Sequence, residues 1–358
     1  MTATSAPSRR IPVGVLGATG AVGQTFIRLL ADHPWFEVAA VAASERSAGK
    51  RYRDAAHWLS GEMPARVADL MVTACDPASV DTQIVFSALD SDAAQEVEAA
   101  FARAGKLVLS NARNYRMDAD VPLLIPEVNP DHLGLLPIQR AARKWSGAIV
   151  TNSNCSTMVI ALALAPLHEA FGVEQLFVTT LQALSGAGYP GVPSLDILGN
   201  IIPFIGGGEE EKIESEPLKI LGVFEHGAVT PARMRVSAQV NRVAVEHGHT
   251  ACMSVKLATA ATPDAAMQAL RSWKGAIAAL GLPSAPAEPV MVTMERDRPQ
   301  PRRDVNAGGG MSVVVGRVRT DPILDLRLVA MGHNTIRGAA GASILNAELM
   351  FARGLIAV

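Results

Sequence analysis

Residues 11–23 of this chain read IPVGVLGATGAVG, an apolar run followed at once by three glycines at intervals of three. The side chains at positions 25, 26, 29 and 30 then recur with the period of a helix. Strand, glycine-rich turn and helix in this order open an α/β unit. This stretch predicts the fold class of the first part of the chain.

The glycine turn is also a candidate dinucleotide site. Glycine has no β-carbon, so the backbone here can approach a pyrophosphate at the amino end of the helix. The Gly-x-x-Gly-x-x-Gly spacing differs from the commoner Gly-x-Gly-x-x-Gly, and a tight structural turn is the alternative interpretation. Its place between a strand and a helix favours a dinucleotide site, formed by Gly17, Thr19, Gly20, Ala21, Val22 and Gly23.

Strand-like and helical segments alternate over the first 150 residues. The strand-like runs after the first are Val38–Ala42, Ile84–Ser87, Lys106–Leu109 and Ala148–Thr151, and Ala93–Ala104 is a typical helical segment. Such alternation predicts a doubly wound parallel sheet of the Rossmann type. After a proline-bearing stretch, 121–137, and the last strand, we expect an apolar helix that begins at Cys155 and ends near Pro166.

A second group of strands follows that helix. Its members are Leu176–Leu181, Met234–Val240, Ala251–Leu257, Val290–Met294, Met311–Arg319 and Leu326–Met331. They predict an α+β unit with a mixed sheet, and we expect the helical tail 335–353 to return to the first unit. The predicted division is therefore 1–151 with 332–358 as a coenzyme-binding domain, and 152–331 as a catalytic and dimerisation domain.

The composition restricts the class of protein. A length of 358 residues suggests two domains at roughly 150 residues each. Hydrophobic residues make up 49% and charged residues 18%, which is typical of a globular chain. The formal net charge of −2 offers no basic field for nucleic acid or an anionic membrane, so a small-molecule partner is expected.

The spacing of the cysteines and the hydropathy of the sequence indicate the cellular compartment of the protein. Cys75, Cys155 and Cys252 have neither the spacing of a disulfide framework nor that of paired metal ligands. No apolar stretch reaches the roughly 18 residues that a membrane span needs. We therefore expect a cytoplasmic protein in a reducing compartment.

The end of the second strand bears on the choice of coenzyme. An NAD-specific site usually places an acid here to hold the ribose diol. This chain has Ser44, Glu45, Arg46 and Ser47 instead, and the arginine and two serines suit the 2′-phosphate of NADP. Glu45 could still face the ribose, and a polar solvent-facing loop is the other interpretation.

Cys155 is the candidate nucleophile. The segment NSNCST, residues 152–157, places it in the first turn of a predicted helix, where the dipole and free amides stabilise a thiolate. We therefore expect the pKa of this thiol to lie below its usual value of about 8.5. An inert buried cysteine is the alternative, and it is our interpretation of Cys75 and Cys252.

Taken together, these motifs resemble the aspartate-semialdehyde dehydrogenase family. The resemblance begins with NCST after the GATGAVG turn, and QALSGAGYPG at 182–191 is similar to the family's active-site glutamine segment. Arg242 and His249 resemble its substrate arginine and its acid/base histidine. Residues 44–49, 202–212 and 298–301 are most similar to the archaeal and fungal branch, so the resemblance spans nearly the whole chain.

The resemblance implies further substrate contacts. Arg116 corresponds to the phosphate-binding arginine, and Asn111 aligns with the same motif, although residues 111–115 depart from the Asn-Ser-Ser of common bacterial members. Glu209 and Lys212 resemble the acid that meets the substrate amine and the lysine that assists at phosphate. The register among residues 209, 210 and 211 stays open, and a solvated charged helix face is the alternative for 209–216.

Other residues are selected by the resemblance alone. An isolated histidine is more often structural, and His247 would share a strand face with His249, so only the seven-residue separation from Arg242 favours His249. The resemblance also implies that Ser87, Ser185, Gly186 and Asn334 contact the coenzyme. Asn334, Thr335 and Gly341 would border the nicotinamide, with close helix packing over 338–342 as the alternative.

The implied reaction is the NADPH-dependent reductive dephosphorylation of aspartyl phosphate to aspartate semialdehyde, on the path to lysine, methionine and threonine. It would proceed through a thioester on Cys155, with His249 moving protons and Gln182 or backbone amides stabilising the oxyanion. A malonyl-CoA or succinyl-CoA reductase of the same fold is one alternative, and a noncatalytic NADP-sensing or redox-sensing protein is another. The apolar second sheet leads us to expect a homodimer or homotetramer.

Overall fold

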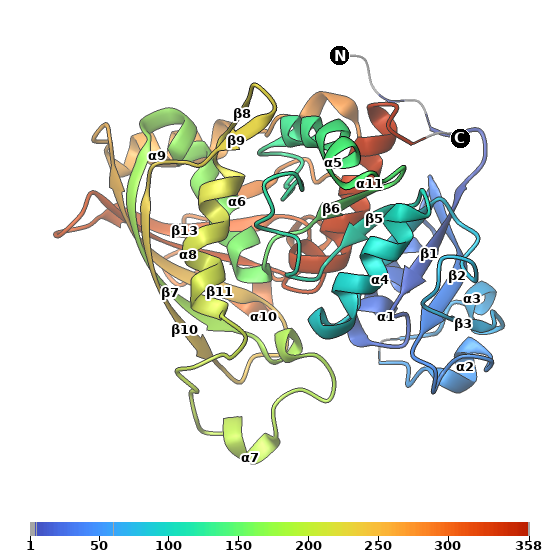
Figure 1. The fold of residues 1–358 in the computed structure, drawn as a ribbon. Helices are drawn as coiled ribbons and strands as arrows, with labels where there is room; N and C mark the ends of the chain where they lie inside the picture. Colours follow the sequence, from blue (N-terminus) through green and yellow to red (C-terminus); the bar gives the residue numbers. More distant parts are fainter. Residues whose placement is uncertain (1–3, 5, 60, 357–358) are drawn as a thin grey trace.

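Within the described residues, two six-stranded sheets and their helices make up the molecule (Figure 1). The computed structural model describes residues 4, 6–59 and 61–356. In the first sheet all neighbouring strands are parallel. Its order is β3 (Val72–Ala74), β2 (Phe36–Ala43), β1 (Ile11–Leu16), β4 (Ile84–Ser87), β5 (Leu107–Ser110) and β6 (Ala148–Thr151). The predicted doubly wound parallel sheet is confirmed, and β3 is a strand that the sequence pattern did not reveal.

Both faces of the first sheet are covered, as its continuous apolar strands require. The side chains of Ile84 and Phe86 on β4 point to one core and that of Val85 to the other. The helices of this part are α1 (Ala21–Leu30), α2 (Tyr52–Ala55), α3 (Ala65–Ala68), α4 (Ser91–Arg103), η1 (Pro130–Gly134) and α5 (Leu135–Arg143).

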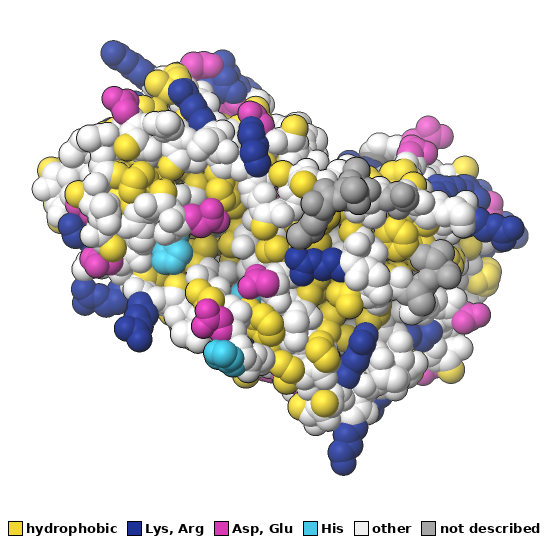
Figure 2. All heavy atoms as spheres, turned by 90° about the horizontal axis from the view of Figure 1, so that it is seen from above, with side chains coloured by type: hydrophobic (Ala, Val, Ile, Leu, Met, Phe, Trp, Pro, Cys, Tyr) yellow, Lys and Arg dark blue, Asp and Glu magenta, His cyan; other side chains and the backbone are white. Residues whose placement is uncertain are grey.

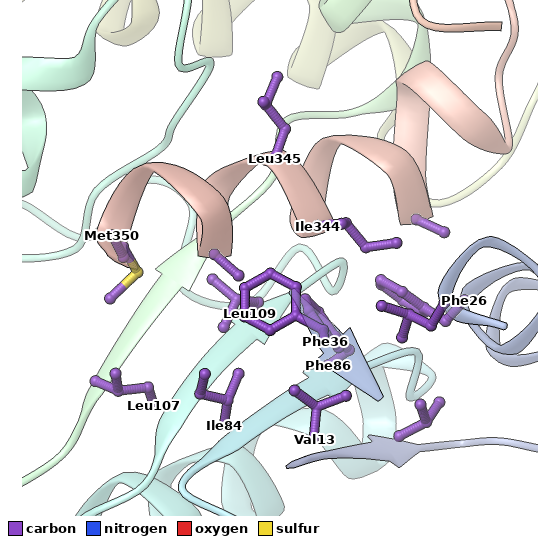
Figure 3. Packing of buried hydrophobic residues seen from close by; sticks show 14 of the residues in the cluster. Val13, Phe26, Phe36, Ile84, Phe86, Leu107, Leu109, Ile344, Leu345 and Met350 are labelled. Carbon is purple, nitrogen blue, oxygen red and sulfur yellow. The ribbon is translucent and has the colours of Figure 1, made fainter. Parts of the chain in front are cut away.

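The C-terminal helix lies on the first sheet although the second sheet precedes it in the chain. Helix α11 (Gly341–Ala352) follows a π-helical turn, η5 (Ile336–Ala340). The side chains of Ile344 and Met350 lie on the side of this helix that faces the strands carrying Val13 and Phe86 (Figure 3). The expectation that the tail returns to the first sheet is therefore confirmed.

The second sheet is mixed. Its order is β10 (Arg235–Arg242), β7 (Val173–Gln182), β11 (His249–Leu257), β14 (Leu326–Gly332), β13 (Val313–Thr320) and β12 (Val290–Val292). The outer pairs β10–β7 and β12–β13 are parallel and the inner pairs are antiparallel, which confirms the predicted mixed sheet. A two-stranded ribbon lies apart from it, β8 (Val223–Glu225) and β9 (Ala228–Thr230). The helices here are α6 (Cys155–Phe171), η2 (Leu184–Ala187), α7 (Ser194–Ile197), α8 (Glu209–Ile220), α9 (Pro263–Ser272), η3 (Ala278–Leu280), α10 (Pro301–Asp304) and η4 (Ala307–Gly310).

Helix α6 forms the centre of the molecule. Every residue from Ser156 to Leu167 is buried, so this part of the helix has no solvent face. The prediction that it ends near Pro166 is wrong, because the helix continues to Phe171, with Glu169 and Ala170 exposed in the last turn. Proline removes one intrahelical hydrogen bond, but its fixed φ is compatible with a helix.

The charges on the face shown in Figure 2 are mixed. Basic and acidic side chains are scattered over this face among hydrophobic side chains rather than gathered in a patch of one sign. Among the described residues, none of the helices combines the length and apolar character that crossing a membrane requires.

One buried ion pair ties the tail to the first part of the chain. Nη1 and Nη2 of Arg337 in η5 donate to Oε1 and Oε2 of Glu127, each over 2.7 Å. The two side chains are 0% and 1% exposed. Because both charges are out of water, the geometry must be bidentate for the pair to be tolerated.

Breaking this pair should destabilise the fold. Glu127→Gln leaves the guanidinium of Arg337 buried without a counter-charge, so we expect the free energy of unfolding to fall by about 3–5 kcal/mol. Urea unfolding followed by circular dichroism measures the change. The matched control is Asp69→Asn, which removes exposed pairs to Arg51 and Arg53 and should cost under about 1 kcal/mol for each pair. Equal losses in the two variants would contradict the prediction.

Candidate active site

A cleft of about 490 Å³ lies where the ends of the two sheets face one another. Segments that follow β4, β5 and β6 line one side, and the ends of β7 and β10 line the other. It brings together most of the predicted site residues, namely Val22, Asn111, Arg116, Cys155, Gln182, Ser185, Gly186, Glu209, Lys212, Arg242 and Asn334.

Cys155 is the first residue of α6, as the sequence predicted. The side chain of Asn154 caps this helix, because its Oδ1 accepts from the backbone N–H groups of Ser156 (2.9 Å) and Thr157 (3.1 Å). Capping satisfies two of the free amides at the helix start. The cysteine is therefore held at a rigid turn rather than on a loop.

The imidazole of His249 lies against the sulfur. Its Nε2 is 3.2 Å from Cys155 Sγ, and its Nδ1 accepts from the backbone N–H of Ala183 at 3.0 Å. An Nδ1 that accepts carries no proton, so the neutral ring presents Nε2–H to the sulfur. Burial, together with the charge of Arg242, lowers the pKa of His249 to about 3.

His247 does not share this position. β11 begins at His249, so His247 lies outside the strand and the two rings do not share a strand face as the sequence pattern suggested. The ring of His247 stacks on His333, with 4.9 Å between centroids, and its Nδ1 contacts the hydroxyl of Ser185 at 2.9 Å. The structure thus places His249 next to the candidate nucleophile and His247 away from it.

The expected depression of the Cys155 pKa is wrong for the ligand-free protein. Burial, together with the negative charge of Glu209, raises the pKa of this thiol to about 12. The guanidinium groups of Arg116 and Arg242 and the amide of Ser156 act in the opposite direction. The favourable helix terminus is present, but the loss of water around the sulfur outweighs it.

Two strand ends supply the polar wall opposite Cys155. Gln182 ends β7 and pairs in register with Arg242, which ends the parallel neighbour β10. Both side chains are buried, and Nη1 of Arg242 donates to the carbonyl of Ala183 at 2.7 Å. Gly186 lies against them, since a β-carbon there would be 3.0 Å from Arg242 Nη1 and 2.9 Å from His249 Cε1. Glycine at 186 is therefore required by the close approach of the loop.

The register of the acidic helix α8 is resolved. Oε1 of Glu209 accepts from Asn154 Nδ2 (2.9 Å) and from Gln182 Nε2 (3.1 Å), and its Oε2 is 3.2 Å from Lys212 Nζ. Glu210 points elsewhere, because its carboxylate accepts from the N–H of Val240 on the edge strand β10. Glu211 is exposed. Glu209 is thus the acid that reaches the cleft.

The alternative of a solvated helix face is wrong for α8. Three charged residues along it, Glu209, Glu216 and Lys219, seven and three positions apart, are buried on one helix face. The other acids have a structural use: Glu214, like Glu210, accepts a backbone N–H from β10, in this case from Ala238. The charged residues therefore cover an otherwise unpaired strand edge on one side and reach the cleft on the other.

Arg116 lines the cleft and is 7% exposed. Its Nη2 donates to the carbonyl oxygen of Asn111 (2.7 Å) and its Nη1 to Glu216 (2.9 Å). Asn111 itself accepts from Asn152 through its side-chain oxygen at 2.9 Å. Glu216 was missed in the sequence, although its seven-residue separation from Glu209 places both on one helix face.

The glycine turn fits a dinucleotide phosphate. A β-carbon at Gly17 would lie 2.6 Å from the carbonyl oxygen of Ala88, and one at Gly23 would lie 2.3 Å from that of Gly17. Gly20 is open, with its nearest atom 3.5 Å away, and it precedes α1 without a side-chain cap. The first amides of this helix, at Ala21 and Val22, thus remain available to an anion. Gly17 and Gly23 serve the tight turn, and Gly20 leaves room for the ligand.

The remaining predicted coenzyme residues differ in whether a ligand can reach them. Ser44, Arg46 and Ser47 form an exposed or half-buried turn directly after β2, and the N–H of Ser47 donates to the carbonyl of Ser44. Asn334 donates to Ser185 Oγ at 2.8 Å and accepts from the N–H of Gly248. By contrast, Ser87 is fully buried and does not line the cleft, so the expectation that it contacts the coenzyme is wrong for this structure.

Two glycines of the tail have different positions. A β-carbon at Gly338 would lie 2.6 Å from Cys155 Cβ, so the π-helical turn packs directly on the nucleophile. Gly341 packs on Met311 and Ile336 and does not line the cleft, so the expectation that it borders the nicotinamide is wrong. The sequence pattern could not separate them, because both glycines lie in one helical stretch.

Comparison with known proteins agrees with this geometry. Residues 12–136 match the family model described as "Semialdehyde dehydrogenase, NAD binding domain", and residues 164–337 match "Semialdehyde dehydrogenase, dimerisation domain". The chain is 52% identical to an aspartate-semialdehyde dehydrogenase of Archaeoglobus fulgidus, over 97% of this chain and all of the relative.

A fungal relative and a solved structure extend the comparison. The chain is 49% identical to the aspartate-semialdehyde dehydrogenase of Schizosaccharomyces pombe, over 96% of this chain and 99% of the relative. The crystal structure of the Candida albicans aspartate semialdehyde dehydrogenase with NADP superposes with a TM-score of 0.90 at 45% identity, covering 97% of this chain and all of that one. This chain therefore belongs to the aspartate-semialdehyde dehydrogenase family.

Proposed function

We propose that this protein catalyses the NADPH-dependent reductive dephosphorylation of L-aspartyl 4-phosphate to L-aspartate 4-semialdehyde. The observation that carries the proposal is the contact of 3.2 Å between Cys155 Sγ and His249 Nε2 in a cleft that three cations, Arg116, Lys212 and Arg242, also line. A sulfur nucleophile, a proton carrier and separate sites for two anionic groups are what this reaction needs.

The covalent step belongs to Cys155. Its thiolate sulfur bonds to the acyl carbon, the bond from that carbon to the phosphate oxygen breaks, and phosphate leaves with the bonding electrons. A thioester on Cys155 results. Reduction of the thioester carbon and loss of the sulfur then release the aldehyde and return the thiolate.

His249 and Gln182 lie where charge changes in these steps. Because Ala183 fixes Nδ1 as an acceptor, His249 can donate from Nε2 to the sulfur or to the carbonyl oxygen that becomes negative. The amide of Gln182 lies beside Glu209 and can supply a second donor to that oxygen. One such donor typically contributes about 3 kcal/mol in the transition state.

The substrate's charged groups have separate partners. Arg242, held by the carbonyl of Ala183, would bind the α-carboxylate, and Glu209 would meet the α-ammonium. Arg116 and Lys212, with Asn111 beside them, would bind the phosphoryl group. Each group of the substrate thus meets a side chain of opposite charge.

NADP, when bound, supplies or accepts the hydride. We propose that the turn at residues 17–23 holds its pyrophosphate and the turn at 44–47 its 2′-phosphate. Ser185, Gly186 and Asn334 would border the nicotinamide, because they line the cleft beside Cys155.

We also propose a domain division, an oligomeric state and a cellular compartment for this protein. Residues 1–151 with 332–358 would form the coenzyme-binding domain, and 152–331 the catalytic domain. A homodimer would form through the face of the second sheet opposite α6, where Phe177 is 53% exposed beside Cys252, although polar residues such as Gln239 make this face less apolar than expected. A cytoplasmic location is supported by the three cysteines, each described and each free.

The substrate class is tested by two parallel assays. We expect phosphate-dependent oxidation of aspartate semialdehyde with NADP, and no reduction of malonyl-CoA or succinyl-CoA with NADPH. Cys155→Ala should abolish the oxidation while NADP binding, measured by calorimetry, is retained. Turnover in that variant would refute the thioester, activity only on CoA thioesters would favour the reductase, and inactivity on every substrate would favour a sensor.

The raised thiol pKa predicts how Cys155 reacts without ligands. Burial and Glu209 both disfavour the thiolate, so alkylation by iodoacetamide should accelerate with pH up to at least pH 9 without reaching a plateau. Glu209→Gln removes a negative charge and should lower the pKa of the Cys155 thiol. For each pKa unit by which it falls, alkylation at pH 8 should be about three- to fourfold faster. Glu210→Gln, whose carboxylate faces β10, is the control, and Cys155→Ala corrects for the other cysteines. A slower rate in Glu209→Gln would contradict the assignment.

The choice of coenzyme is tested at Arg46. Only NADP has a 2′-phosphate to pair with this guanidinium, so Arg46→Ala should weaken NADP binding about tenfold or more, at 1.5–3 kcal/mol for a charge-assisted contact, and NAD binding far less. Fluorescence titration with the two coenzymes measures the ratio. A similar loss for both would remove Arg46 from this role.

A further inference from the structure

Glu216 is a buried carboxylate that the mechanism above does not use. It lies on α8, two turns beyond Glu209, and is 2% exposed. Oε1 accepts from Nη1 of Arg116 at 2.9 Å, and Oε2 accepts from the backbone N–H of Asn154 at 2.6 Å. A carboxylate out of water is tolerated only where such partners compensate it.

The two donors belong to different parts of the proposed site. Arg116 comes from the loop after β5, in the first sheet, and is the candidate phosphate ligand. Asn154 precedes Cys155 and caps the helix that carries it. One carboxylate of α8 therefore joins the anion-binding side chain to the backbone that carries the nucleophile.

We propose that Glu216 is a positioning residue that holds Arg116 at a fixed distance from Cys155, so that phosphate is bound while the sulfur attacks. This inference rests on the proposed function, since it presumes a phosphoryl group at Arg116. An acyl phosphate must present its carbon to the sulfur and its phosphate to the cation together, and small displacements in such an arrangement cost rate.

The contacts of Arg116 explain why one carboxylate, that of Glu216, is enough to orient its guanidinium. Nη1 is held by Glu216 and Nη2 by the carbonyl of Asn111, so the plane of the guanidinium is fixed. Within the described residues, its buried Nε has no hydrogen-bond partner. The guanidinium therefore keeps donors that are not used within the protein, and a phosphate can accept from them.

The next turn of α8 contacts the backbone of the loop that carries Arg116. Nζ of Lys219, also buried, donates to the carbonyls of Arg116, Asp118 and Val121, each over 2.7 Å. Lys219 thus fixes the backbone of the loop and Glu216 fixes the side chain that it carries. Lys219 therefore maintains the conformation of the loop, and Glu216 sets the orientation of the guanidinium.

A double-mutant cycle on the full-length enzyme tests the inference. Glu216→Gln keeps the volume but has only one acceptor, so it cannot serve both Arg116 and the N–H of Asn154. We expect the Michaelis constant for inorganic phosphate to rise about tenfold or more, as for the loss of one charge-assisted contact, and that for aspartate semialdehyde to change less than about twofold. In an Arg116→Ala background, which raises the phosphate constant by itself, Glu216→Gln should add nothing.

The control is Glu214→Gln, the same substitution on the same helix at a carboxylate that accepts an N–H of β10. It should leave both Michaelis constants unchanged. NADP binding and the unfolding midpoint show whether Glu216→Gln is folded, and if it is not, Glu216→Asp carries the test, because the shorter acid reaches only one partner.

The outcomes separate the two proposals. A wild-type rate that does not depend on phosphate would overturn the proposed function and this inference with it. If the wild type depends on phosphate, the inference alone is overturned when Glu216→Gln leaves the phosphate constant unchanged, raises both constants equally, or adds its full effect to that of Arg116→Ala.

Discussion

The contact between Cys155 Sγ and His249 Nε2 is the constraint on which the rest of the structure depends, because it joins the two sheets. Cys155 follows the last strand of the first sheet, and His249 begins a central strand of the second. For them to meet, residues 156–167 of α6 must run through the centre with no solvent face, and the tail must pack Gly338 against the cysteine. The burial of this part of α6 on all sides and the glycine at 338 both follow from this geometry.

Charge at the site is controlled by burial and by compensation. Burial of the thiol, the imidazole and Arg242 shifts the pKa of each group, and the charges of Arg116 and Arg242 act on the thiol, so their charged forms depend on one another. Glu209 and Glu216 balance the cations, and each also accepts from a group that positions Cys155. The same carboxylates thus maintain the structure and set the electrostatic field in which the sulfur reacts.

Helix α8 shows how one element can serve both purposes. Its acids on one side, Glu210 and Glu214, satisfy N–H groups of the edge strand β10. Those on the other side reach the cleft, and Lys219 anchors the loop that carries Arg116. A helix with this many charges is stable here because its partners are backbone groups and opposite charges that would otherwise be unpaired.

Local pattern alone determined much of the architecture. Strands β1, β4 and β6 and the start of α6 lie at the predicted residues, because apolar runs, glycine turns and helix starts depend on neighbours in the chain. The resemblance to a known family then selected residues such as Arg242 and His249, because their spacing indicates a function only by comparison with that family. Only the tertiary structure decided that Glu209 rather than Glu210 faces the cleft, that α6 passes Pro166, and that the thiol pKa is raised. Each of these depends on desolvation or on contacts between distant segments, to which no local pattern responds.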